Sequence, residues 1–136
     1  MLSNGAISWK SQRQQTIALS STEAEYMAIT EASKEAIWLR RLYNEISGHA
    51  GQHEVSEPLL QQIMVDNNGA VALAKNPKHH NRTKHIDIRH YFIRDAVNSK
   101  LIELHRVDSS LNTSDILTKA LSVELHQRHM KGLGLQ

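Results

Sequence analysis

Three acidic side chains stand in contexts where their carboxylates could act together on metal ions. Glu25 opens the apolar stripe of an expected helix, Asp66 directly follows an apolar run, and Asp115 lies in the first turn of another expected helix. Hydrolysis of a phosphodiester requires charge stabilisation at the attacking and the leaving oxygen, which two metal ions roughly 4 Å apart provide. Because Mg²⁺ prefers oxygen ligands, Asp and Glu suit it better than His does. The three residues are therefore candidates for a two-metal site that cleaves nucleic acid.

Each of these carboxylates also has a purely structural explanation. Glu25 could complete a capping box with Thr22 at the start of its helix. Asp66 could cap the helix that follows it, and Asp115 suits the positive end of a helix macrodipole. The spacing does not decide between these roles and metal binding, so both stay open at this point.

A basic stretch between residues 75 and 94 is a candidate nucleic-acid surface. Its cationic residues are Lys75, Lys78, Arg82, Lys84, Arg89 and Arg94. The formal net charge of the whole chain is only +2, which allows a nucleic-acid partner without demanding one, because phosphate binding depends on a local patch. The alternative is an ordinary solvated helix and loop. The histidines of this stretch match no known zinc spacing, and the chain has no cysteine.

The length and composition predict one globular domain over residues 1–136, since 136 residues are enough to bury a substantial core. Disulfides and thiolate metal sites are excluded by the absence of cysteine. No apolar run approaches the length of a membrane span, so we expect no membrane partner and a location in the cytoplasm or the nucleus.

The hydrophobic periodicity predicts an α/β arrangement, with one layer of sheet and helices packed on it. The expected strands are 6–11 and 16–20, paired as a hairpin, then 59–65 and 101–107; the expected helices are 20–46, 67–75, 84–98, 113–121 and 123–130. The long first helix should begin with a capping box, either Ser20 with Glu23 or Thr22 with Glu25. Its predicted buried stripe is Glu25, Ile29, Ala32, Ala36, Leu39, Tyr43 and Ile46. Trp9 and Trp38 could stack on bases, but isolated tryptophans are more often core residues.

Several segments of the chain together resemble the ribonuclease H domain of copia-type LTR retrotransposon polyproteins. They are Ile7–Ser11 through Ser20–Tyr26, Val65–Asn68, Lys84–His90 and Asp115–Lys119, in the order of the family and over nearly the whole chain. The resemblance implies a mixed five-stranded sheet with flanking helices. It also implies cleavage of RNA in RNA–DNA hybrids with two Mg²⁺ (or Mn²⁺) ions, which removes the RNA template during reverse transcription.

Carried over position by position, Glu25, Asp66 and Asp115 match three of the four metal-binding carboxylates of that family. Asn112, three residues before Asp115, also matches the pattern. The candidate nucleic-acid contacts are Lys84, His85, Arg89, Asn67 and Asn112. The RNA–DNA hybrid is thus the expected partner.

The chain departs from the family pattern at its start. The opening residues 1–5 leave no room for the first strand of the family, which bears its first catalytic aspartate. We therefore expect a ribonuclease H-like fold truncated at the N-terminus, with impaired catalysis. The place of the missing strand in the sheet could be filled by direct pairing of the neighbouring strands, by a homodimer, or by a strand-donating protein partner. The alternative function is a non-catalytic module, derived from a retroelement, that binds nucleic acid or protein.

Overall fold

The computed structural model describes residues 5–46, 60–75 and 84–135. The chain divides into two compact units, each described here by itself. The first combines the N-terminal segment Met1–Ile17 with the C-terminal segment Val107–Gln136, and the second is Ala18–Arg106. A single domain over residues 1–136 remains a prediction.

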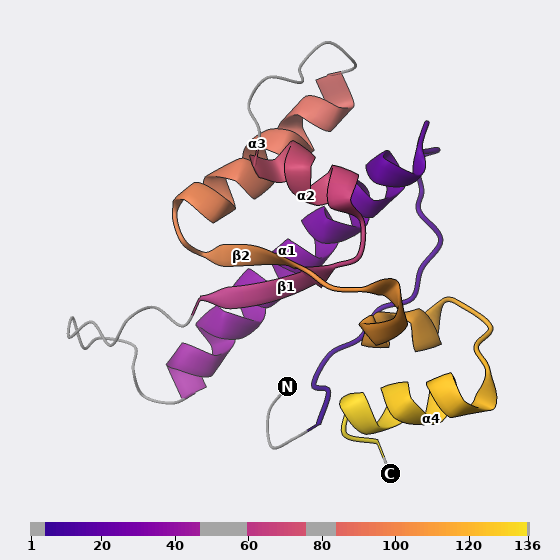
Figure 1. The fold of residues 1–136 in the computed structure, drawn as a ribbon. Helices are drawn as coiled ribbons and strands as arrows, with labels where there is room; N and C mark the ends of the chain where they lie inside the picture. Colours follow the sequence, from indigo (N-terminus) through magenta and orange to yellow (C-terminus); the bar gives the residue numbers. More distant parts are fainter. Residues whose placement is uncertain (1–4, 47–59, 76–83, 136) are drawn as a thin grey trace. The chain divides into compact units, whose positions relative to one another are not determined.

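The unit Ala18–Arg106 contains three helices and two strands (Figure 1). In chain order they are α1 (Ser21–Ile46), β1 (Gln61–Val65), α2 (Asn68–Lys75), α3 (Lys84–Asn98) and β2 (Ile102–Arg106). All five were predicted from the sequence, and none of their ends differs from prediction by more than two residues. The predicted cap of α1 is also present: Glu23 N donates to Ser20 Oγ at 3.1 Å, and Leu19 N donates to Glu23 Oε2 at 2.7 Å.

The two strands form a parallel pair in which Ile63 lies opposite Leu104. Parallel strands need a crossover connection, and α2 and α3 supply it. Side chains alternate between the faces of a strand. Ile63, Val65, Ile102 and Leu104 accordingly belong to the core cluster, whereas Met64 on the other face is exposed. The sheet is therefore covered by helices on one face.

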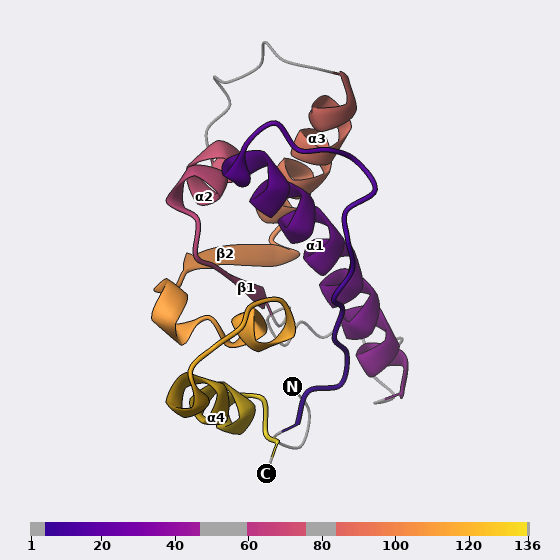
Figure 2. The same ribbon diagram turned by 90° about the vertical axis from the view of Figure 1, so that its right-hand side faces the viewer.

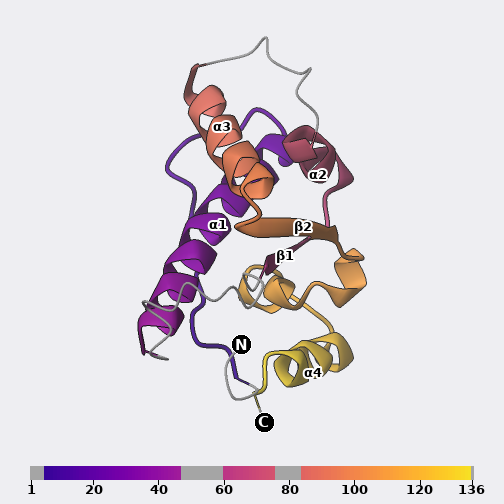
Figure 3. The ribbon, with the colours of Figure 1, turned by 90° about the vertical axis from the view of Figure 1, so that its left-hand side faces the viewer.

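The core of this unit is built from small and branched side chains of all three helices. Ile29 of α1, Ala70 and Ala74 of α2, and Ile93 and Ala96 of α3 all pack in it. The alanines let the helices approach the sheet closely. Figure 2 and Figure 3 show α2 and α3 beside the N-terminal half of α1.

The buried face of α1 differs from the predicted stripe. The buried residues are Tyr26, Met27, Ile29, Thr30, Ser33 and Ile37, and of the predicted stripe only Ile29 is fully buried. The stripe was misplaced because it treated Thr30 and Ser33 as polar surface residues. Thr30 Oγ1 donates to Tyr26 O at 2.9 Å and Ser33 Oγ donates to Ile29 O at 2.7 Å. With their hydroxyls bonded to the preceding turn, both side chains can face the core.

The helix α3 ends in a left-handed residue. Lys100 has φ 53°, Lys100 N donates to Val97 O at 3.1 Å, and Leu101 N donates to Ala96 O at 2.9 Å. These two bonds are those of a Schellman motif, in which glycine usually holds the left-handed position. The motif turns the chain sharply from α3 into β2.

The other unit contains helical elements. They are the 3₁₀ helices η1 (Ser109–Leu111) and η2 (Thr113–Leu117) and the helix α4 (Val123–Gly132). Ser122 caps α4 by accepting a hydrogen bond from Leu125 N at 3.3 Å. Two contacts tie the N-terminal segment to these elements: Ala6 N donates to Leu133 O at 3.2 Å, and Ser11 Oγ donates to Leu117 O at 3.0 Å. The predicted α-helix over 113–121 is a 3₁₀ helix that ends at Leu117.

The predicted hairpin of residues 6–11 and 16–20 is wrong, because the structure has no strand in either segment. Its apolar side chains therefore lie on no sheet: Ile7, Trp9, Ile17 and Leu19 are exposed. An isolated two-stranded hairpin is marginal in water, and apolar alternation alone does not form one. The expected core positions of Trp9 and Trp38 are likewise wrong, since both are more than half exposed.

The α/β class is confirmed, but the described residues contain two strands rather than the four expected from the sequence. The alternative in which a strand over residues 6–11 pairs directly with β1 lacks that strand in the structure. Among the described helices, none has the length and apolar character needed to cross a membrane.

Candidate functional site

A close approach of two helix ends brings Glu25 and Asp66 into one region of the unit Ala18–Arg106. A Cβ placed on Gly69 would lie 2.9 Å from Thr22 Oγ1 and 3.2 Å from Thr22 Cγ2. The first turns of α1 and α2 are therefore in contact. Glu25 follows Thr22 by about one helical turn, and Asp66 lies two residues before α2. Both acids are half-buried.

Asp66 stands at the carboxyl end of the parallel strand pair. It follows Val65, whose register partner Arg106 is the last residue of β2. In parallel α/β sheets, ligands characteristically bind outside the carboxyl ends of the strands. The capping role considered for Asp66 belongs instead to Asn67, whose Oδ1 accepts a hydrogen bond from Ala70 N at 3.1 Å. Asp66 is thus positioned at a ligand-binding edge without being the cap of α2.

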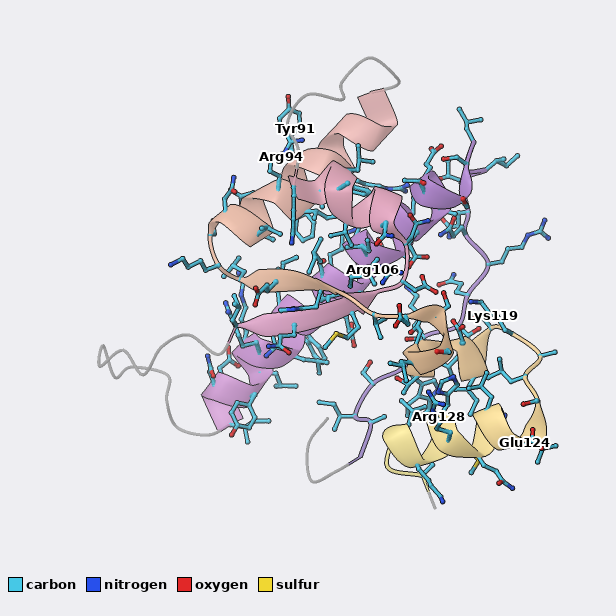
Figure 4. The ribbon with its side chains drawn as sticks, in the orientation of Figure 1. Tyr91, Arg94, Arg106, Lys119, Glu124 and Arg128 are labelled. Atoms are coloured by element: carbon cyan, nitrogen blue, oxygen red, sulfur yellow. The ribbon has the colours of Figure 1, made fainter. Side chains whose placement is uncertain are left out.

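Asp115 belongs to the other unit, where it is buried within η2. Its Oδ1 accepts a hydrogen bond from Asn112 Nδ2 at 3.3 Å, and its Oδ2 pairs with Lys119 Nζ at 2.8 Å. Asn112 is itself fixed, because its Oδ1 caps η2 by accepting from Ser114 N at 3.3 Å. Both carboxylate oxygens of Asp115 therefore have a partner, Asn112 on one and Lys119 on the other. Lys119 is labelled in Figure 4.

Lys119 is a residue that our reading of the sequence did not single out. Its spacing of four residues from Asp115 was the available signal, since side chains at that distance meet on a helical turn. The same unit carries a second cationic contact in Arg128 of α4, whose Nη2 donates to Ser110 O at 3.0 Å.

Tyr26, next to Glu25, was also missed. Its ring is buried in the core, and burial raises the pKa of its phenol to about 12, while the positive charge of Arg94 partly opposes that rise. The phenol is therefore neutral at physiological pH. Its spacing of three and four residues from Ile29 and Thr30 is the helical signal that would have placed it inside.

The candidate nucleic-acid contacts are only partly described. Arg89 is half-buried on α3, whereas the side chains of Lys84 and His85 lie outside the described part of the structure, as does the whole of segment 76–83. Asn67 and Asn112 each cap a helix through their amide oxygens. Their contact with nucleic acid remains a prediction.

The donor chemistry of the three carboxylates fits Mg²⁺ or Mn²⁺, because all of them offer hard oxygen ligands. Glu25 and Asp66 lie in one unit and Asp115 in the other. Within the described residues, no three His, Asp or Glu side chains gather closely enough to hold a metal ion. What the structure does bring together is the first turn of α1, which leads to Glu25, with the start of α2, which follows Asp66. In the other unit it brings together Asn112, Asp115 and Lys119.

The known proteins that this chain resembles over most of its length include three Pol polyproteins. The chain is 41% identical over 119 residues to the retrovirus-related Pol polyprotein from transposon TNT 1-94 of Nicotiana tabacum, a match that covers 88% of this chain. It is 35% and 36% identical over 134 residues to the retrovirus-related Pol polyproteins from transposons RE2 and RE1 of Arabidopsis thaliana, each covering 98% of this chain. All three of these relatives are retrovirus-related Pol polyproteins.

These homologies support an origin in a retrotransposon Pol polyprotein. The chain spans only 8% to 9% of the length of these relatives. No family model matches the chain. No solved structure matches it either.

Proposed function

We propose that this chain is a ribonuclease H-type segment of a retrotransposon Pol polyprotein, which cleaves the RNA strand of RNA–DNA hybrids. The observation that supports the proposal is the homology to Pol polyproteins over 98% of the chain, a span that contains Glu25, Asp66 and Asp115. The position of Asp66 at the carboxyl edge of a parallel strand pair agrees with it.

In this proposal Glu25, Asp66 and Asp115 hold divalent metal ions, Mg²⁺ or Mn²⁺. The ions, when bound, supply charge stabilisation at the attacking and leaving oxygens of the phosphodiester. The contact of Thr22 with Gly69 positions Glu25 relative to Asp66, because it fixes the first turn of α1 against α2. Asn112 orients Asp115 through its amide nitrogen.

The same proposal gives the basic residues Lys84, His85 and Arg89 of α3 the role of binding the phosphates of the hybrid. Phosphate contacts release counterions, so the affinity for the hybrid should fall steeply as salt rises. Asn67 and Asn112 would contact the hybrid beside the metal-binding carboxylates.

The test is cleavage of a hybrid labelled on its RNA strand, with Mg²⁺ or Mn²⁺, by the protein and by the double variant Glu25→Gln, Asp66→Asn. We expect the variant to lose at least about 100-fold in rate, the upper range for residues that merely support a metal ligand. The matched control is Glu45→Gln, Asp95→Asn, which removes the same two charges at exposed positions of α1 and α3 and should cleave normally.

Equal cleavage by the protein and the Glu25→Gln, Asp66→Asn variant would remove these residues from the site. Hybrid binding without any cleavage, in well-folded protein, would favour the non-catalytic binding module instead. RNA–RNA and DNA–DNA duplexes in the same assay establish whether the hybrid is the preferred substrate.

A further inference from the structure

The surroundings of Asp115 hold a feature that the proposed function does not use. The residue is buried, and both of its carboxylate oxygens are already bonded, one to an amide and the other to an ammonium group. A buried carboxylate without compensation is costly, so these partners stabilise it in the absence of a metal ion. Of the two, only Lys119 brings a positive charge.

The two partners differ in how firmly they are held. Asn112 is fixed by its second role as the cap of η2. The side chain of Lys119 is 52% exposed, whereas that of Asp115 is 10% exposed. A lysine ammonium is a compact charge on a flexible four-carbon stem. It can therefore leave the carboxylate for water while Asn112 keeps Asp115 in place.

We propose that Lys119 is a displaceable counter-ion of Asp115. It neutralises the carboxylate while no divalent cation is present and yields its place on Oδ2 when one binds. Lys119 is thus a positioning residue that competes with the metal ion and keeps the site intact without it. The inference rests on the proposed role of Asp115 as a metal ligand.

The consequence is measurable as metal affinity. Removing a competing cation should tighten Mn²⁺ binding, and the strength of a partly exposed ion pair predicts a gain of up to about fivefold. Lys119→Met removes the competitor entirely. Lys119→Gln removes the charge but leaves a hydrogen-bond donor for Asp115, which protects the fold if the methionine variant is unstable.

The experiment is titration of the protein with Mn²⁺, with free Mn²⁺ followed by electron paramagnetic resonance and folding followed by circular dichroism. We expect tighter binding by Lys119→Met and Lys119→Gln than by the unaltered protein. The control Lys131→Met removes the same charge from an exposed position of α4 and should bind as the unaltered protein does. Adding Asp115→Asn to Lys119→Gln should abolish the gain.

Equal or weaker Mn²⁺ binding by the folded Lys119 variants, or an equal gain in Lys131→Met, would overturn the counter-ion proposal. So would an absence of Mn²⁺ binding in every variant. The proposed function fails in a different way. A gain that depends on Asp115 but is unchanged by Glu25→Gln, Asp66→Asn would support the counter-ion and remove the shared metal site.

Discussion

Burial of a single side chain can change its pKa, and Tyr26 is the clearest case in this protein. Burial raises the pKa of its phenol to about 12 in the folded protein, against an ordinary value of 10.0. As pH rises from 10 towards 12, the unfolded chain loses this proton first, so the stability falls through that window. At pH 11 this site should have removed about 1 kcal/mol from the free energy of unfolding. Tyr26→Phe should lack that loss.

The measurement is urea unfolding of both proteins at pH 8 and pH 11. Because lysines also titrate in this range, the informative quantity is the difference between the protein and its variant at each pH. Tyr43→Phe makes the same chemical change at an exposed position of α1 and serves as the control. An identical pH dependence in the protein and Tyr26→Phe would contradict the buried phenol.

Among the secondary-structure elements, α1 and α2 contact each other closely because Gly69 has no side chain. Gly69→Ala would place a Cβ 2.9 Å from Thr22 Oγ1, so α2 or Thr22 must shift. Overpacking of this kind outweighs the better helix propensity of alanine, and we expect a net loss of about 1 kcal/mol. Thermal and urea unfolding measure it.

A double-mutant cycle makes that prediction specific. Thr22→Ala removes two of the three atoms that the new Cβ would approach and leaves Asn67 Oδ1 at 3.1 Å, so it should restore part of the stability lost in Gly69→Ala. If the two changes are simply additive, the helix ends are not in contact at this point. Because the contact joins the first turn of α1, which leads to Glu25, to the start of α2, which follows Asp66, Gly69→Ala should also slow any hybrid cleavage, and Thr22→Ala should partly restore it.

For the molecule as a whole, the solvent exposure of its large apolar side chains can be tested by fluorescence. Trp9 is 73% exposed and Trp38 is 54% exposed. An exposed indole emits at long wavelength and is readily quenched, so we expect acrylamide to quench the native protein nearly as well as the unfolded one. A clear blue shift and protection from quenching would mean that another chain covers these residues. Trp9→Phe and Trp38→Phe would then show which of them is covered.

That outcome bears on the expected homodimer and strand-donating partner, which both remain predictions. Light scattering at the same protein concentration distinguishes them from a monomer. A monomer with exposed tryptophans would exclude the dimer under those conditions. The location in the cytoplasm or the nucleus also remains a prediction.

Elements whose signals are local could be predicted from the amino-acid sequence. The cap of Ser20 and Glu23 and the apolar runs of β1 and β2 sufficed to locate α1 and both strands, because capping and periodicity act within a few residues. Sequence motifs likewise indicated the retrotransposon origin that the homologues support. The assignment of Glu25, Asp66 and Asp115 to metal ions remains a prediction.

Features that depend on packing partners could not be predicted in this way and became visible in the folded structure. It chose the face of α1 that is buried, since Thr30 and Ser33 can satisfy their hydroxyls within the helix and face the core. Residues 6–11 and 16–20 form no strand, because alternating apolar and polar residues give a stable strand only where it can pair within a larger sheet. The pairing of Asp115 with Lys119 also depends on the tertiary structure. Their spacing of four residues permits the contact, and burial of the carboxylate favours a positively charged partner.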